Sequence, residues 1–163
     1  MTADEKSLLL PSGVGKTVSL QGNQLTFVHP DPTDAYALID WITPPGLPSP
    51  PLHIHRVTDE AFYVLEGTFG FQADEEIIEG SAGAFIFIPH GRKHTFWNQG
   101  SVPSRVLIVL SPSGFERYFE ELAEGLAAIG EQPAEAMSLR KALSQRYDIE
   151  VVGPPRAAQQ NPL

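Results

Sequence analysis

Cysteine is absent from the sequence, which excludes disulfide bridges, thiolate metal ligands and a cysteine nucleophile. Any metal ion must therefore be held by nitrogen and oxygen ligands. No segment approaches the roughly 18 apolar residues of a membrane span, and the N-terminal MTADEKSLLLPSG lacks the basic region of a signal peptide. We therefore expect a cytoplasmic protein that does not enter a membrane.

Positive charge is scarce: 11 lysine and arginine residues are outnumbered by 20 acidic ones, which gives a formal net charge of −9. Nucleic acid and anionic membranes repel such a chain, so we expect neither as a partner. A length of 163 residues with 42% hydrophobic and 19% charged residues is typical of a globular protein. The sequence therefore predicts one domain over residues 1–163, whose partner is a small molecule or another protein.

Strand-like runs separated by short turns extend from Thr17 to Leu110. These turns are too short to hold a crossover helix, which indicates antiparallel pairing in a sandwich or barrel. The 15 prolines and 14 glycines fit a fold of short strands and turns. The sequence therefore predicts a mainly β fold with a barrel over about residues 15–111.

A helical extension is expected over about residues 112–150. Ser113 and Glu116 have the S-x-x-E spacing of a capping box, and apolar residues then recur at helical spacing. A second helix is expected from about Pro133 to Arg146, because proline is favoured at the first helical position. A short strand, YDIEVV, is expected to stop at the following Gly-Pro-Pro. The apolar face of the first helix is interpreted as packing against the barrel or a second subunit, through Phe115, Phe119, Leu122 and Leu126.

Four side chains are candidate metal ligands: His53, His55, Glu60 and His94. His53 and His55 are two apart on a predicted strand, so both imidazoles point to the same face. Glu60 lies five residues beyond His55, and it returns to that face only if residues 56–59 form a bend. His94 comes from a distant hairpin, PHGRKHTFWN, and adds a third nitrogen. These ligands suit one divalent Fe, Mn, Ni, Cu or Zn ion and leave one or two of its positions open.

The candidate ligands sit in two segments, GLPSPPLHIHRVTDEAFYVLEG and GAFIFIPHGRKHTFWN, whose spacing resembles the two motifs of the cupin family. One matching residue, Gly46, stands one position further upstream than in the usual cupin form. The other spacings fit without adjustment. The matching residues are Gly46, His53, His55, Glu60 and Gly67 in the first motif and Gly83, Pro89, Gly91, His94 and Asn98 in the second.

The resemblance implies an antiparallel double-stranded β-helix, the jelly-roll cupin barrel, followed by one or two C-terminal helices. The segments after the barrel resemble those of single-domain, conserved-barrel cupins similar to quercetin 2,3-dioxygenase. In such relatives a metal centre binds an enolic or flavonol-type substrate beside dioxygen, and the residue matching Glu60 takes a proton. Cupins commonly dimerise, so the resemblance also implies a homodimer.

Several functions stay open, because cupins use the same metal cage for different chemistries. The leading hypothesis is a metal-dependent dioxygenase that acts on an aromatic, flavonol-like or enolic small molecule. The alternatives are a non-catalytic small-molecule-binding cupin, as a sensor or storage protein, and a metal-dependent isomerase or decarboxylase. A cupin that works without metal, and a Glu60 that is a ligand without being a base, are open as well.

Apolar residues near the candidate ligands are predicted to bind the substrate. Phe62, Val64 and Phe96 share strand parity with Glu60 or His94 and are expected to line the cavity. An apolar lining favours an aromatic or otherwise hydrophobic ligand over a sugar phosphate, which needs basic residues. Five further aromatic residues can belong either to the pocket or to the core: Tyr36, Phe69, Phe71, Phe85 and Phe87. Among these, Tyr36 is predicted to contact the substrate.

Overall fold

Strands are the commonest element in the computed structural model, which describes residues 14–28, 34–130 and 132–156. The strands that precede the first helix are β1 (Lys16–Leu20), β2 (Asn23–Val28), β3 (Ala37–Thr43), β4 (Pro51–Ile54), β5 (Asp59–Glu66), β6 (Thr68–Ala73), β7 (Glu76–Ser81), β8 (Phe85–Ile88), β9 (His94–Asn98) and β10 (Ser104–Ser111). Two helices, α1 (Glu116–Ile129) and α2 (Pro133–Arg146), and a last strand, β11 (Glu150–Pro155), follow. The mainly β prediction is confirmed.

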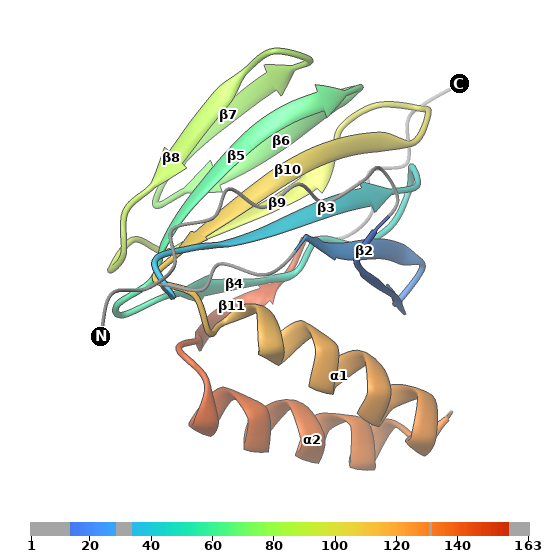
Figure 1. Ribbon diagram of the computed structural model, residues 1–163. Coiled ribbons are helices and arrows are strands. Elements are labelled where there is room, and N and C mark those ends of the chain that lie inside the picture. Colours follow the sequence, from blue (N-terminus) through green and yellow to red (C-terminus); the bar gives the residue numbers. More distant parts are fainter. Residues whose placement is uncertain (1–13, 29–33, 131, 157–163) are drawn as a thin grey trace.

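The strands form two sheets that lie face to face, with the helices at one end (Figure 1). One sheet has six strands in the order β1-β2-β3-β10-β5-β8, and the other has five in the order β11-β4-β9-β6-β7. Neighbouring strands pair antiparallel in both sheets. This is the antiparallel barrel that the short turns predicted.

The core lies between the two sheets and follows from the two-residue period of the strands. In β3 and β10 every second side chain is buried, and β10 pairs with both β3 and β5 at the centre of the six-stranded sheet. Aromatic rings fill much of the interior, where Phe96 contacts Trp41 edge to face at 5.3 Å. The largest fully buried side chains include Phe27, Phe62, Phe69 and Phe71.

Two residues of the cupin-like motifs hold the end of the barrel together. Gly67 has a φ of 76°, and a Cβ at this position would lie 2.1 Å from Ser104 Oγ, so only glycine fits. Asn98, at the end of β9, donates from Nδ2 to the carbonyls of Thr43 and Val102 at 3.0 and 2.7 Å. Its Oδ1 accepts the hydroxyl of Ser104 at 2.9 Å. These contacts make Asn98 a hydrogen-bonding residue at a strand end.

The capping-box prediction for the first helix is wrong in detail. Helix α1 begins at Glu116, so Ser113 lies too far ahead to cap it, and the hydroxyl of Ser113 lies 3.5 Å from Asp34 instead. The carboxylate of Glu116 turns back and accepts the N–H of Gly114 at 2.5 Å. The bounds of α2 agree with the prediction. Neither described helix is long and apolar enough to cross a membrane.

The last strand runs further than the sequence predicts. Proline supplies no N–H donor, so Pro154 and Pro155 were expected to stop it. Strand β11 nevertheless extends to Pro155, because it is the edge strand of its sheet and pairs on one side only, with β4. Its pairing places Val151 opposite His53 and Glu150 opposite Ile54. The C-terminal part of the chain therefore lies directly beside the strand that carries His53.

Candidate metal centre

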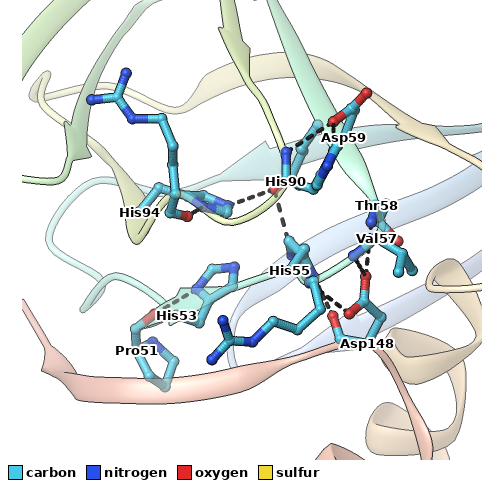
Figure 2. A network of polar contacts seen from close by, with 12 residues as sticks. Pro51, His53, His55, Val57, Thr58, Asp59, His90, His94 and Asp148 are labelled. Carbon is cyan, nitrogen blue, oxygen red and sulfur yellow. Dashed lines mark hydrogen bonds and ion pairs between the residues drawn. The ribbon is translucent and has the colours of Figure 1, made fainter.

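The four predicted ligands come together in one group, and Figure 2 shows its three histidines. His53 lies in β4, His55 directly follows β4, Glu60 lies in β5 and His94 opens β9. One potential ligand atom from each residue lies within 4.8 Å of all the others. All four side chains are buried, with at most 5% of any residue exposed. The structure therefore brings together every residue of the predicted ligand set.

Strand pairing explains this convergence. Strands β4 and β9 are neighbours, and His53 and His94 are direct register partners, so their ring centroids are 4.4 Å apart. His55 lies on the same side as His53, at 4.9 Å between ring centroids, as strand parity requires. Residues 56–58 form the expected bend, and Glu60 arrives from the opposite sheet. The site therefore joins the two sheets.

Hydrogen bonds to the backbone fix the orientation of all three imidazoles. Each ring uses its Nδ1, and a carbonyl oxygen can only accept, so each Nδ1 carries a hydrogen and donates it. The acceptors are the carbonyls of Pro51 for His53 at 2.7 Å, of Arg92 for His94 at 3.0 Å and of Asp148 for His55. Each Nε2 is left to face the site, which is the arrangement that metal-binding histidines adopt.

Two observations at the site point to a bound cation. Nε2 of His55 is buried and makes no hydrogen bond. Nε2 of His94 lies 2.8 Å from Oε2 of Glu60, and a lone pair can face a carboxylate at that distance only with a proton or a cation between them. Three imidazole nitrogens and one carboxylate oxygen suit a divalent transition metal ion. The residues therefore fit one such ion.

Burial and mutual charge set the protonation of the metal-free site. Burial, aided by the charges of His94 and His55, lowers the pKa of His53 to about 3. Burial also disfavours the charged forms of His94 and Glu60, but the hydrogen bond and the attraction between these two side chains have the larger effect. This interaction raises the pKa of His94 and lowers the pKa of Glu60. Without metal, His53 is therefore neutral at pH 7.

The lowered pKa of His53 predicts that the metal-free protein loses stability in acid. Between pH 6.5 and about 3, the unfolded chain binds a proton at His53 that the folded chain does not bind. The free energy of unfolding therefore decreases as the pH is lowered through this window, by an amount approaching ~1.4 kcal/mol per pH unit. Glu60 adds to the loss below pH 4.5, whereas the stabilisation from His94 is complete below 6.5 and is lost only as pH rises.

Urea unfolding of chelator-treated protein from pH 7 to pH 4 measures this slope. His53→Ala is expected to flatten it, whereas His90→Ala, which removes an exposed histidine, is expected to leave it unchanged. If His53→Ala has the same slope as the parent, the loss of stability in acid does not come from the lowered pKa of His53.

The residues predicted to line the substrate cavity lie in two different environments. Phe62, Val64 and Phe96 point to the same side as the ligands and are buried, at 0%, 0% and 4% exposed. The ring centroids of Phe62 and Phe96 are 5.1 Å apart, so these side chains belong to the hydrophobic core next to the site. Tyr36 precedes β3 and is 45% exposed. Their contact with a substrate stays a prediction.

The structure also separates the aromatic residues that the sequence left between pocket and core. Phe69 and Phe71 are core residues, at 0% and 1% exposed. Phe85 and Phe87 instead lie on the outer side of β8, at 65% and 53% exposed. Neither of these two lines the interior.

Sequence reasoning missed the contacts that two residues make with the site. Phe115, expected only to pack, lies edge to face on the ring of His55 at 4.2 Å, so the start of α1 covers the site. Asp148 carries no periodicity or motif signal, yet it bonds to His55 and to the bend. Burial opposes its charge, but hydrogen bonds from the bend outweigh burial and lower the pKa of Asp148. The contact partners of both residues are remote in sequence.

Comparison with known proteins agrees with this geometry. Residues 40–110, which include all four ligands, match the family described as Cupin domain (Cupin_2). The tetracenomycin polyketide synthase protein TcmJ from Streptomyces glaucescens is 30% identical over 60 residues, which are 37% of this chain and 40% of TcmJ. This chain spans less than half of the length of each curated relative that it matches.

Solved structures share the fold. KdgF from Halomonas sp. superposes with a TM-score of 0.61 and 20% identity, over 69% of this chain and 99% of KdgF. The polyketide cyclase RemF from Streptomyces resistomycificus superposes with a TM-score of 0.57 and 23% identity, over 66% of this chain and 81% of RemF.

The fold and the site define an antiparallel β-barrel protein with a buried centre of three histidines and one glutamate that can hold a metal ion. Residues 40–110 match the cupin domain, and the solved structures share the fold of this chain.

Proposed function

We propose that this protein is a metal-dependent oxygenase that binds an aromatic, flavonol-like or enolic small molecule through oxygen. The observation that carries the proposal is the convergence of three Nε2 atoms and one carboxylate oxygen within 4.8 Å. Four protein ligands leave one or two positions for substrate and dioxygen on a five- or six-coordinate Fe, Mn, Ni, Cu or Zn ion. A bound ion would supply Lewis-acid polarisation of the substrate oxygen and ease the loss of its proton.

Glu60 is the residue that we propose as the general base. Its Oε2 lies 2.8 Å from Nε2 of His94 and 3.7 Å from Nε2 of His55, at the centre of the cluster. A carboxylate in this position can accept a proton from a substrate bound in the open position, and His94 holds it in place. Burial of all four ligands excludes water and strengthens each of these interactions.

The substrate class follows from the apolar surroundings of the site. Phe62 and Phe96, two positions along the strands from Glu60 and His94, are buried and hydrophobic, and Phe115 contacts the ring of His55 from the start of α1. A flat hydrophobic molecule with an enol or phenol oxygen complements such a lining better than a sugar phosphate does. Phe62, Val64, Phe96 and Tyr36 remain the residues that we propose to contact it.

Oxygen consumption tests the proposed activity. Protein loaded in turn with each of the five metals is offered a panel of flavonols and β-diketones, and we expect oxygen uptake with at least one metal. The His94→Ala protein serves as the control and is expected to consume no oxygen above background. Absence of uptake with every metal would sink the oxygenase proposal.

Glu60→Gln separates the two roles of this residue in the same assay. Glutamine keeps an oxygen that can face the ion but accepts a proton poorly. We expect a variant that retains bound metal and loses turnover. Full turnover in the metal-loaded variant would show that Glu60 is a ligand and not a general base.

A second candidate is a metal-assisted reaction without dioxygen, such as isomerisation or decarboxylation of an enolisable substrate. The similarity to TcmJ, which is described as a polyketide synthase protein, favours it. The same panel under anaerobic conditions distinguishes the two, because this candidate forms product without oxygen. A binding protein would instead show ligand-induced stabilisation of ~2.7 kcal/mol at 100 times the dissociation constant, and no product. The homodimer and the cytoplasmic location stay predictions.

A further inference from the structure

Asp148 lies outside the residues that match the cupin domain, in the connection between α2 and β11, and yet it contacts the metal centre. Its backbone carbonyl accepts the Nδ1 hydrogen of His55. Its carboxylate accepts three successive backbone N–H groups of the bend, and Figure 2 shows it beside Val57 and Thr58. These donors are Arg56 at 2.7 Å, Val57 at 2.9 Å and Thr58 at 2.8 Å, between 90 and 92 residues away in sequence.

We propose that Asp148 is a positioning residue that holds His55 and the 56–58 bend so that His55 and Glu60 meet at one point. The inference deepens the proposed function, because it rests on the metal centre. It assigns to the C-terminal extension a part in forming that centre.

The bend needs such a partner for a physical reason. Glu60 follows His55 by an odd number of residues, so the chain must leave the strand conformation between them to bring both side chains to one side. Leaving the sheet removes the ladder partners of the N–H groups in residues 56–58. A single carboxylate that accepts all three satisfies them through charge-assisted hydrogen bonds and fixes their geometry.

The carbonyl of Asp148 has a separate effect on His55. Because it accepts the Nδ1 hydrogen, it selects the tautomer whose Nε2 lone pair faces the site. The ring of Phe115 contacts the same imidazole at 4.2 Å. His55 is thus held at Nδ1 by the α2–β11 connection and across its ring by the start of α1.

The position of Asp148 is itself fixed from several sides. The pairing of β11 with β4 holds the chain that follows it, and Glu150 forms an ion pair with Arg56 of the bend. The hydroxyl of the preceding Tyr147 lies 2.5 Å from a carboxylate oxygen of Glu121 in α1. These contacts make the α2–β11 connection a rigid support for the bend.

Replacement of Asp148 tests the proposal in the full-length protein. Asp148→Ala removes all three acceptor contacts, and Asp148→Asn keeps one oxygen acceptor without the charge. The matched control is Asp40→Asn, since Asp40 is also a half-buried carboxylate, which accepts two hydrogen bonds from Arg105 on the outer face of the six-stranded sheet. Calorimetric titration with Zn²⁺ measures metal affinity.

We expect Asp148→Ala to weaken Zn²⁺ binding by about 10–100-fold, as losses of hydrogen-bond partners of metal ligands do, with Asp148→Asn between it and the parent. Asp40→Asn is expected to bind Zn²⁺ like the parent even where its melting temperature falls. Parent-like affinity in both Asp148 variants would overturn the proposal.

Two NMR readouts on metal-free protein keep this test separate from the test of the proposed function. Backbone amide exchange of residues 56–58 is expected to accelerate in the Asp148 variants, because the carboxylate that accepts these three N–H groups is lost or neutralised. The ¹⁵N shifts of the His55 ring are expected to keep the parent tautomer, because both variants retain the backbone carbonyl that accepts its Nδ1 hydrogen. Asp40→Asn is expected to leave both readouts unchanged. A parent that binds no metal overturns the proposed function alone, and unchanged amide exchange in both Asp148 variants overturns the role of Asp148.

Discussion

Replacement of His94 by alanine is expected to weaken binding of a divalent transition metal by more than ~100-fold. The change removes one of four ligands, and loss of a hydrogen-bond partner of a ligand alone costs roughly 10–100-fold. It also leaves the buried carboxylate of Glu60 without the imidazole that lies 2.8 Å away. Calorimetric titration of chelator-treated protein with Zn²⁺ measures the change.

His90→Ala is the matched control for this experiment. His90 belongs to the same segment, but its side chain is 58% exposed and its Nδ1 pairs with Asp59 at 2.7 Å. Its loss is expected to leave metal affinity unchanged. A His94→Ala protein that bound the ion as tightly as the parent would refute the ligand assignment. Elemental analysis of protein purified without added metal identifies the ion that the site holds.

Replacement of Phe62 by alanine is expected to destabilise the protein by ~3–5 kcal/mol, the usual cost of removing a buried phenylalanine ring. Phe62 is fully buried and its ring lies 5.1 Å from the rings of both Phe71 and Phe96. Urea unfolding at pH 7 measures the loss. The comparison is Phe87→Ala on the outer face of β8, which is expected to change stability by ~0.5 kcal/mol or less.

Substrate affinity of the folded Phe62→Ala protein tests the second role of this ring. Weaker binding beside the expected loss of stability would show that Phe62 both supports the core and contacts the substrate. Parent-like binding would leave Phe62 a core residue only.

The ligand set was predictable because all but one of its steps are local. Strand parity puts His53 and His55 on one face, and the short distance from His55 to Glu60 demands a bend that the structure contains. The pairing of His53 with His94 is the one remote step, and the spacing of two motifs supplied it. The bounds of α2 were predictable for a similar reason, since Pro133 marks its start.

The remaining features depend on contacts that sequence patterns do not encode. In β8, Phe85 and Phe87 alternate with the equally apolar Ile86 and Ile88, so hydrophobicity cannot tell which pair faces inward. Asp148 carries no pattern at all, because its partners lie about 90 residues away on a bend. Such a contact follows only from the packing of the C-terminal extension against β4.

The burial of the four ligands has a kinetic consequence. No ligand residue is more than 5% exposed, so an ion in solution meets them only when a neighbouring segment opens. Entry and departure of the ion are then governed by the rate of that opening rather than by diffusion. Slow exchange of this kind means that the metal content of the purified protein records which ion was abundant while the chain folded.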